Sequence, residues 1–442
     1  MMRMKCEKKL LLVGIFMMVS TAIGFSQEYR DSEADSVEVV ELSLEDAKSY
    51  ALEHNYSIQN ASIDVQKAEA SKWEMISSML PQVSLKADYS NQLGYEMNLG
   101  GMSISMPPYG SLGLTTAVAL TGAQVVGLQI SNISKKMSDI TLKQTEQDIA
   151  NQVKVLYYSA LVTEETISLL EQNVQSLDDL YQYTLKAVEV GTAEQTSADQ
   201  ILVQVETMKS SVNSTQRSLE MVYNSLRLLL NISAETEIVL TQEIPDLLNV
   251  DSAFSLINEE FDVNDNYNYQ LLQKSTELSK KQVDMAAWNY GPTLSLFHQY
   301  SAKHYFSDEM TMNMTPPNMI GLSISIPIFT SGKNYSTLKG AKLDYKKQLN
   351  TLQNTEKSLN IQHRQLCYNL TSAFERFNIQ KQNVEVTQRV FDNISKKYQY
   401  GMASSMEVTT AGTDLVSVQS SYVQALLDFV NAQIELEKLL NK

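Results

Sequence analysis

The second half of this 442-residue chain repeats the residue pattern of the first half at a spacing of about 210 residues. The matched positions of the first copy are Asn55, Tyr56, Gln59, Pro81, Leu112, Gly113, Leu114, Gly191, Leu226, Leu229, Leu230 and Asn231. In the same order, those of the second copy are Asn266, Tyr267, Gln270, Pro292, Ile320, Gly321, Leu322, Gly401, Leu436, Leu439, Leu440 and Asn441. A repeat of this length indicates one structural unit that is built twice.

Residues that stop helices are missing from long parts of both copies. No proline occurs between Pro108 and Pro245 or after Pro327. Glycine is absent from three stretches, 128–190, 192–290 and 341–400. Such stretches predict helices well above the usual length. At a rise of about 1.5 Å per residue, a helix from about Gln124 to Val190 would be roughly 100 Å long.

Apolar side chains recur three and four residues apart after Gly191 and after Gly401, with one polar interruption at Thr215 in the first series. The first series is Ile201, Val205, Met208, Val212, Leu219, Val222, Leu226 and Leu229, and the series 210 residues later is Ala411, Leu415, Val418, Tyr422, Phe429, Ala432, Leu436 and Leu439. The helix before Gly191 has its own series, Ile149, Val153, Leu156, Ala160, Ile167, Leu170, Val174, Leu177, Tyr181 and Val188. This spacing is typical of helices that pack along one seam, so we interpret these residues as coiled-coil packing residues.

Between the helices of each copy, the hydrophobic period changes to two. Apolar residues alternate with polar or small ones over four segments of about ten residues, near 83–90, 112–120, 294–300 and 320–328. Such alternation predicts strands with one apolar and one polar face. Strands of this length can cross a bilayer when tilted by about 45°. The candidate lipid-facing residues are Val83, Leu85, Tyr89, Leu114, Val118, Leu294, Leu296, Leu322, Ile324 and Ile326.

Four strands cannot close a barrel on their own. An open sheet edge in hydrocarbon would leave unpaired N–H and C=O groups, each costing several kcal/mol. No segment after the N-terminal leader is apolar enough to cross a membrane as a helix, so any spanning must use the strands. We therefore expect several chains to associate until the sheet closes around a polar interior.

The N-terminus has the pattern of a cleaved secretory signal peptide. Four basic residues precede the apolar run 10–16, and small residues follow it up to Ser26, where we expect cleavage. Cys367 is then the only thiol of the mature chain, which excludes an internal disulfide. The expected organisation is a signal peptide at 1–26, an acidic segment at 27–41, a first repeat at 42–232, a connection at 233–263 and a second repeat at 264–442.

The composition argues against nucleic-acid binding and catalysis. The formal net charge of −16 disfavours contact with phosphate backbones. The four histidines are scattered without metal-ligand spacing, and no nucleophile or phosphate-loop motif is present, so we expect no enzyme activity, cofactor or metal centre. Clustered thioethers suit Cu(I), and two loops carry them at Met97, Met102, Met106, Met310, Met312 and Met314. An apolar loop beside the outer leaflet is the preferred interpretation of these methionines.

Three segments carry a resemblance to the TolC-like outer-membrane efflux family. They read SIQNASIDVQKAEASKWEMISSMLPQVSLKADYS, IGLSISIPIFTSGK and YQYGMASSMEVTTAGTDLVSVQSSYVQALLDFVNAQIELEKLL. The resemblance covers essentially the whole mature chain. It implies a homotrimer with a twelve-stranded transmembrane β-barrel, four strands per protomer, and a periplasmic α-barrel of twelve helices. It also implies location in the outer membrane and docking to a periplasmic adaptor (membrane fusion) protein and an inner-membrane transporter.

The resemblance further implies a periplasmic gate near the two tip glycines, Gly191 and Gly401. A tyrosine three residues before the second glycine and a carboxylate six residues after it match Tyr398 and Glu407. A further acidic position of the family is Thr410 here. The carboxylate expected after the first glycine is Ser197, with Asp199 nearby. The alternative role of Tyr398 is packing in the helical seam, and that of Glu407 is a solvated charge at the start of a helix.

Two functional hypotheses follow. The first is a porin-like channel that serves as the passive outer-membrane duct of a tripartite export system. The second is a non-conducting periplasmic coiled-coil scaffold or adaptor. Adaptors usually have one helical hairpin, whereas this chain has two hairpins and strands of bilayer-crossing length, which favours the duct. The sequence does not specify the exported substrate.

Overall fold

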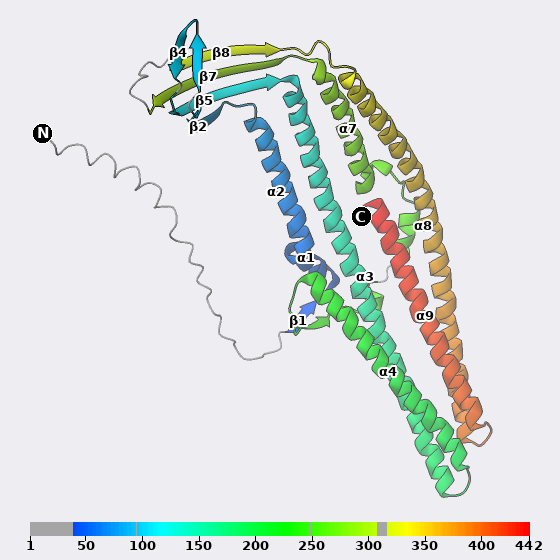
Figure 1. Cartoon of the computed structure of the whole chain (residues 1–442). Helices are drawn as coiled ribbons and strands as arrows, with labels where there is room; N and C mark the ends of the chain where they lie inside the picture. Colours follow the sequence, from blue (N-terminus) through cyan, green and yellow to red (C-terminus); the bar gives the residue numbers. More distant parts are fainter. Residues whose placement is uncertain (1–38, 94, 106, 248–249, 307–315) are drawn as a thin grey trace, which may run out of the picture. The chain divides into compact units, whose positions relative to one another are not determined.

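The computed structural model describes residues 39–442 except positions 94, 106, 248–249 and 307–315. Figure 1 shows two long helical hairpins and a small sheet. The predicted signal peptide lies outside the described residues, as do positions 27–38 of the acidic segment. Within the described part of the chain, no helix combines the length and the hydropathy needed to span a membrane.

The two copies have the same order of elements: a helix, two long strands, a very long helix and a shorter helix. In the first copy these are α2 (Tyr56–Ser77), β2 (Gln82–Ser90), β5 (Tyr109–Thr121), α3 (Gly122–Glu189) and α4 (Gln195–Leu230). In the second copy they are α7 (Tyr267–Ala287), β7 (Thr293–Tyr305), β8 (Asn318–Ser325), α8 (Lys333–Gln399) and α9 (Ser405–Leu440). The predicted order is confirmed, and α3 spans 68 residues.

Smaller elements join these units. They are β1 (Val39–Leu42), α1 (Leu44–His54), β3 (Glu96–Leu99), β4 (Met102–Ser105), β6 (Glu237–Leu240), α5 (Ile244–Leu247), α6 (Val250–Ile257), and the 3₁₀ turns η1 (Val263–Asp265) and η2 (Trp288–Tyr290). β1 and β6 pair in parallel, and β3 and β4 form a hairpin in the first inter-strand segment, which the sequence predicted only as a loop.

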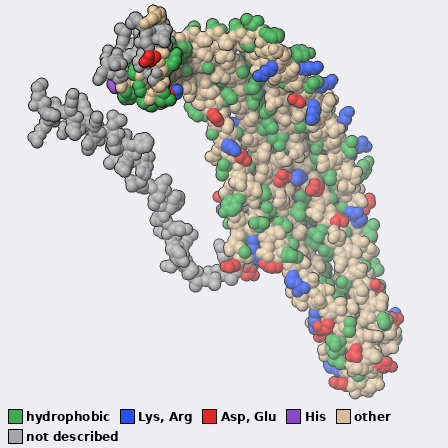
Figure 2. Space-filling model, in the orientation of Figure 1, with side chains coloured by type: hydrophobic (Ala, Val, Ile, Leu, Met, Phe, Trp, Pro, Cys, Tyr) green, Lys and Arg blue, Asp and Glu red, His purple; other side chains and the backbone are tan. Residues whose placement is uncertain are grey.

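The four long strands form one antiparallel sheet in the order β2-β5-β7-β8. The register aligns the apolar residues of neighbouring strands, because Leu85 lies opposite Leu114 and Leu296 lies opposite both Val118 and Leu322. One face of the sheet is therefore mainly apolar, and polar and small residues predominate on the other. Figure 2 shows hydrophobic side chains at the surface of this region.

The end of the last predicted strand, 326–328, falls outside the sheet. β8 ends at Ser325, so Ile326 lies in the connection to α8 and not in a strand. The physical reason is Pro327, which has no N–H to donate to a neighbouring strand. Ile326 is nevertheless 59% exposed. Most candidate strand residues of the apolar face are also exposed, to differing degrees.

The predicted helical seams form two hydrophobic clusters. The larger one joins α3, α4, α8 and α9 to α1 and β6, and the Tyr157 hydroxyl donates a hydrogen bond to the Leu42 carbonyl at 3.0 Å within it. The smaller one lies toward the ends of the two hairpins and includes Leu177, Ile201 and Leu415. Since helix pairs at this spacing bury an apolar stripe, the seams account for how the hairpins pack.

The two repeats are joined near the sheet by a tryptophan that covers a glycine. Gly122 is the first residue of α3, and a β-carbon on it would lie 2.3 Å from the ring of Trp288. We expect Gly122→Ala to lower the free energy of unfolding by about 1–3 kcal/mol, because the ring must move. Gly340→Ala is the matched control in α8, since a β-carbon there meets nothing within 4 Å.

Gly340→Ala should be neutral or raise stability by up to about 1 kcal/mol, because alanine is the better helix former. Denaturant midpoints of the two purified variants in detergent test the pair. Equal midpoints for the two variants would show that Trp288 does not hold this junction.

Candidate functional site

Each long hairpin ends in a tight turn built on a glycine. Gly191 has φ +78° and Gly401 has φ +70°, the left-handed region that glycine adopts without steric cost. In both turns the amide after the glycine donates to the carbonyl five residues back, at 2.8 Å. This bond satisfies a helix-terminal carbonyl. The two predicted tip glycines thus close two matching turns.

Two hydrogen bonds join the end of α3 to the end of α8. The Tyr183 hydroxyl donates to the Gln399 carbonyl at 2.5 Å, and the Thr184 and Tyr398 hydroxyl oxygens lie 3.1 Å apart. The single proton of Thr184 is donated to the Leu180 carbonyl at 2.8 Å, so Tyr398 donates to Thr184. We call these two α3–α8 contacts the tip hydrogen bonds.

Further polar contacts join α4 to α9 and α3 to α9. The Ser405 hydroxyl donates to the Gln200 side-chain oxygen at 2.8 Å. Deeper in the hairpins, the Asn173 amide donates to the Gln419 side-chain oxygen at 2.6 Å, and both residues are buried. The two hairpins are therefore held by directed bonds as well as by apolar packing.

The side chain of Tyr398 has two roles in this geometry. Its ring is half-buried against the smaller hydrophobic cluster, which confirms it as a packing residue. Its hydroxyl reaches Thr184 on the other hairpin. A phenol can do both because one end of it is apolar and the other is polar.

Glu407 is bonded to its own helix start and not to Tyr398. Its carboxylate accepts from the Ser404 amide at 2.7 Å, and its amide donates to the Ser404 hydroxyl at 3.2 Å. This reciprocal pair is a capping box at the start of α9. The backbone hydrogen bond from Ser404, followed by the one from its hydroxyl, lowers the pKa of the exposed Glu407 carboxyl.

The first tip departs from this arrangement. The residues that correspond to Ser404 and Glu407 are Glu194 and Ser197, so the acidic and hydroxyl residues have exchanged places. Glu194 makes no side-chain cap hydrogen bond to α4. Asp199 accepts from the Gln195 amide at 2.8 Å, one turn along the same helix. The predicted site residues of the first tip thus lack the box that holds the second.

The Glu407 box predicts an acid-sensitive helix start. Because the folded-state pKa is depressed, the stabilisation is present above the ordinary pKa of 4.5 and is lost as the pH falls through the folded value. The protection of the Ser404 amide from exchange, taken relative to the intrinsic rate at each pH, should therefore fall below about pH 4.5. Glu407→Gln should remove this pH dependence, because an uncharged glutamine can still close the box.

Glu407→Ala should expose the Ser404 amide at every pH. Hydrogen exchange of the α4 start, which has no such box, provides the internal reference. A wild-type α9 start whose exchange follows the α4 start through pH 4 would contradict the assignment.

A groove between α8 and α9 opens beside the second turn. Glu407 and Thr410 both contribute to it, and Asp414 adds a second carboxylate one turn further along α9. The apolar part of the lining comes from Val390, Ile394, Met406 and Ala411. Thr410, where the family resemblance implies an acidic residue, thus lines the same groove as the Asp414 carboxylate.

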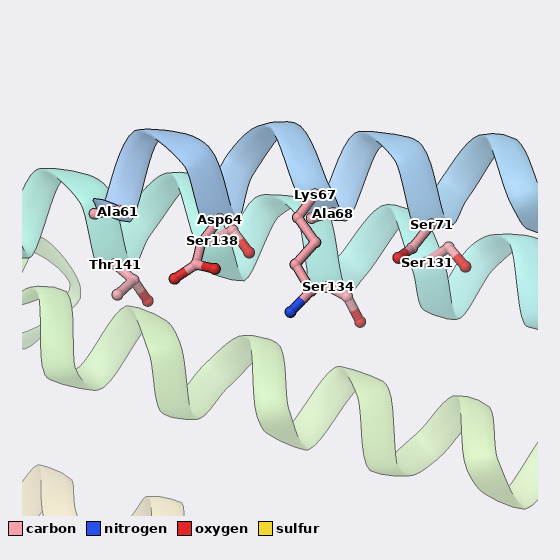
Figure 3. Close-up of a pocket in the computed structure, with 9 residues that line it drawn as sticks. All are labelled: Ala61, Asp64, Lys67, Ala68, Ser71, Ser131, Ser134, Ser138 and Thr141. Carbon is pink, nitrogen blue, oxygen red and sulfur yellow. The ribbon is translucent and has the colours of Figure 1, made fainter. Parts of the chain in front are cut away.

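A second groove runs between α2 and α3, closer to the sheet. Figure 3 shows that mainly small and hydroxyl side chains line it, together with Asp64 and Lys67. Its lining is Ala61, Asp64, Lys67, Ala68, Ser71, Ser131, Ser134, Ser138 and Thr141. Small side chains allow the two helices to approach closely, so the groove is explained by helix packing.

Apart from Ile326, the candidate lipid-facing residues lie together on the apolar sheet face. Val83, Leu85 and Tyr89 of β2 and Leu322 and Ile324 of β8 are all at least 63% exposed in the single chain. The central-strand candidates are less exposed, at 38% for Leu294, 48% for Leu296 and 39% for Leu114, with Val118 half-buried. Each outer strand pairs with one neighbour among the described residues, so both sheet edges are open.

The methionine hypothesis falls largely outside the described residues. Met106, Met310, Met312 and Met314 are not described, and only the backbone of Met97 and Met102 is described. Among the described residues, no three His, Cys, Asp or Glu side chains meet in a group that could hold a metal ion.

Sequence reasoning missed the partners of Tyr398 and Gln419. Thr184 lies seven residues after Leu177, at a position where the seam calls for an apolar residue. A polar residue inside an apolar seam indicates a specific partner, so Thr184 could have been found as a candidate. Its pairing with Tyr398 could not, because it depends on how the two hairpins are staggered.

A family model described as outer membrane efflux protein matches residues 48–231 and 270–442. The curated outer membrane protein TolC of Salmonella enteritidis is 22% identical over 382 residues, covering 83% of this chain and 75% of that protein. Toxin and drug export protein A of Aggregatibacter actinomycetemcomitans is 22% identical over 390 residues, covering 87% and 82%.

Solved structures share the fold. CusC, whose crystal structures concern folding and transmembrane channel formation, has a TM-score of 0.74 at 17% identity, covering 93% of this chain and 95% of that chain. The outer membrane protein VceC of Vibrio cholerae has a TM-score of 0.73 at 16% identity, covering 90% and 95%. The open-state MtrE channel of Neisseria gonorrhoeae scores 0.72 at 16% identity, covering 93% and 94%.

Proposed function

The chain belongs to the outer membrane efflux protein family, and from this membership we propose that it is the outer-membrane duct of a tripartite export system. Substrates delivered by an inner-membrane transporter and a periplasmic adaptor would pass through it by passive conduction. The observation that carries the proposal is the four-stranded sheet with an apolar face and two open edges.

The open edges support closure by further copies. An unpaired strand edge is costly in hydrocarbon, so β8 of one copy would pair with β2 of the next. Three copies give a twelve-stranded barrel, and strand number is even, as in bacterial single-chain barrels. The layer of α2, α3, α7 and α8, in which each helix contacts the next, would continue it as a twelve-helix periplasmic tube.

The remaining sequence hypotheses extend this proposal. The signal peptide at 1–26 would direct export. The repeats at 42–232 and 264–442 would each supply half of the protomer, which agrees with the two separate family-model matches. The capped tip around Gly401 and the less securely capped tip around Gly191 would form the periplasmic end, and the acidic groove of α8 and α9 would be available to the adaptor.

Membrane fractionation tests the proposal against the scaffold alternative. A barrel should stay in the outer-membrane fraction through salt and alkali and come off only in detergent. The extracted protein should then have the mass of a trimer by native mass spectrometry and conduct ions in planar bilayers. Release by alkali as a non-conducting protein would favour the scaffold.

A further inference from the structure

The contact between the two repeats inside one chain is a template for the contact between two chains. Inside the chain, β5 pairs with β7, and α3 packs against α7. Where β5 passes into α3, the Trp288 ring from the end of α7 fills the space beside Gly122. An aromatic residue on a helix end thus covers a strand-to-helix junction that has no side chain.

The equivalent junction of the second repeat is uncovered in the single chain. It lies where β8 passes into α8, at residues 326–332. A β-carbon on Gly332 meets nothing within 4 Å. Ile328 is 97% exposed and Phe329 is 85% exposed, which is unusual for large apolar side chains outside an interface.

The helix end that would cover this junction carries no tryptophan. Trp288 lies four residues before Pro292, and the residue four before Pro81 is Ser77 at the end of α2. Leu80, between Ser77 and the first strand, is 47% exposed. In the contact inside the chain, the bulky side chain is Trp288 on the helix end, and the junction has Gly122. In the second repeat, the junction itself carries the bulky side chains, Ile328 and Phe329.

We propose that, in the assembled duct, Ile328 and Phe329 of one copy fill the hollow beside Ser77 and Leu80 of the next copy. This inference rests on the proposed function, because it requires β8 of one copy to meet β2 of another. As inside the chain, an aromatic side chain would fill the space between a helix end and a strand-to-helix junction. Between copies, the junction and not the helix end would supply it.

The open faces of α2 and α8 favour a second copy as the occupant. Tyr56, Ile63, Ala70 and Ser77 recur every seven residues on α2, and the first three are exposed. This spacing is that of a helix-packing stripe without its partner. The partner helix on the template is the one that follows β8, which is α8.

Charge agrees with this pairing. Glu74 is exposed near the sheet end of α2. The first fifteen residues of α8 carry five exposed lysines, and none forms an ion pair with a described residue: Lys333, Lys339, Lys342, Lys346 and Lys347. The exposed Glu74 carboxylate of α2 has the opposite charge to these lysines, so the two helices are electrostatically complementary.

Disulfide trapping tests the contact. In a Cys367→Ser parent, Leu80→Cys combined with Phe329→Cys should form disulfides between copies, giving covalent trimers under mild oxidation. A link within one chain is excluded, because β2 and β8 lie three strand spacings apart, about 14 Å, and a disulfide needs Cα atoms within about 7 Å. Phe329→Cys with Val190→Cys, an exposed residue at the tip, is the negative control.

Native mass spectrometry of the Cys367→Ser parent distinguishes a failure of the plug contact from a failure of the proposed duct. A trimeric parent whose Leu80→Cys/Phe329→Cys variant links no more than the negative control would overturn the plug and leave the duct intact. A monomeric parent would overturn both.

Moving the large side chain from position 329 to position 77 gives a second, independent test. Phe329→Gly should lower the fraction of trimer that survives detergent and heat by at least half. Adding Ser77→Trp should restore it, because the interface would then copy the Trp288–Gly122 contact. Failure of the double variant to exceed Phe329→Gly, with monomer folding unchanged by circular dichroism, would show that the two positions do not meet.

Discussion

Replacing Tyr398 by Phe is expected to raise the single-channel conductance of the duct in planar bilayers, and Thr184→Val is expected to do the same. Each change removes the α3–α8 bond between these two hydroxyls while the Tyr398 ring keeps its packing. A neutral hydrogen bond contributes about 1 kcal/mol. If three protomers open together, the loss would total about 3 kcal/mol, roughly a hundredfold in the ratio of closed to open states.

The double variant shows whether the two residues act through one bond. If they do, Tyr398→Phe/Thr184→Val should behave like the stronger single variant, because the second change has nothing left to remove. Additive effects would mean that each side chain acts through a different partner. Tyr183→Phe, which removes the other tip hydrogen bond, should add to either of them.

Matched controls distinguish the bond from a general effect of the substitutions. Thr184 also donates to a carbonyl four residues back in its own helix, and Thr207 does the same on α4. Thr207→Val should therefore leave conductance unchanged. Tyr422→Phe removes a hydroxyl from the larger hydrophobic cluster and should also have no effect. Unchanged conductance in the Tyr398 and Thr184 variants would remove this pair from the gate.

The regular parts of the fold could be predicted from the sequence because they depend on local patterns. The breaker-free stretch predicted a helix from about Gln124 to Val190, and α3 runs from Gly122 to Glu189. The alternation of period two predicted all four strands of the sheet. It extended the last one too far, to Ile328, because the apolar pattern continues past Ser325, where the strand ends just before Pro327.

The contacts between distant parts of the chain could not be predicted in the same way. Gly122 and Trp288 lie 166 positions apart by their numbers, and their contact depends on the pairing of β5 with β7. For Glu407 the family resemblance implied a gate role and the alternative was a charge at a helix start, and the structure shows its carboxylate capping α9. The Gly122–Trp288 contact needs the long-range pairing of β5 with β7, whereas the Glu407 bond is local to the start of α9.

The buried bond between Asn173 and Gln419 shows how the stagger itself is fixed. Asn173 lies 18 positions before Gly191, and Gln419 lies 18 positions after Gly401. Two residues at the same distance from their turns face each other when the hairpins are in register. A slip of one helical turn would move them about 5.4 Å apart and leave both amides buried without a partner.

Gln419→Leu is therefore expected to destabilise the tip more than a surface change of the same size. It leaves the Asn173 amide buried and unpaired, which costs about 1–3 kcal/mol. Asn173→Leu should cost a similar amount, because it leaves the Gln419 side-chain amide buried and unpaired. The double variant should recover most of the loss, since two apolar side chains leave no polar group unsatisfied.

Recovery of stability should not bring back the register. Without the polar pair, α3 and α9 are held by apolar side chains that can interlock at neighbouring steps of the seam, and one buried polar pair is what specifies a register. We expect the double variant to regain the denaturant midpoint of the wild type but to show faster amide exchange at both turns and a spread of conductance levels. A double variant as unstable as the worse single variant would mean that side-chain shape, and not the paired amides, sets the fit at this position.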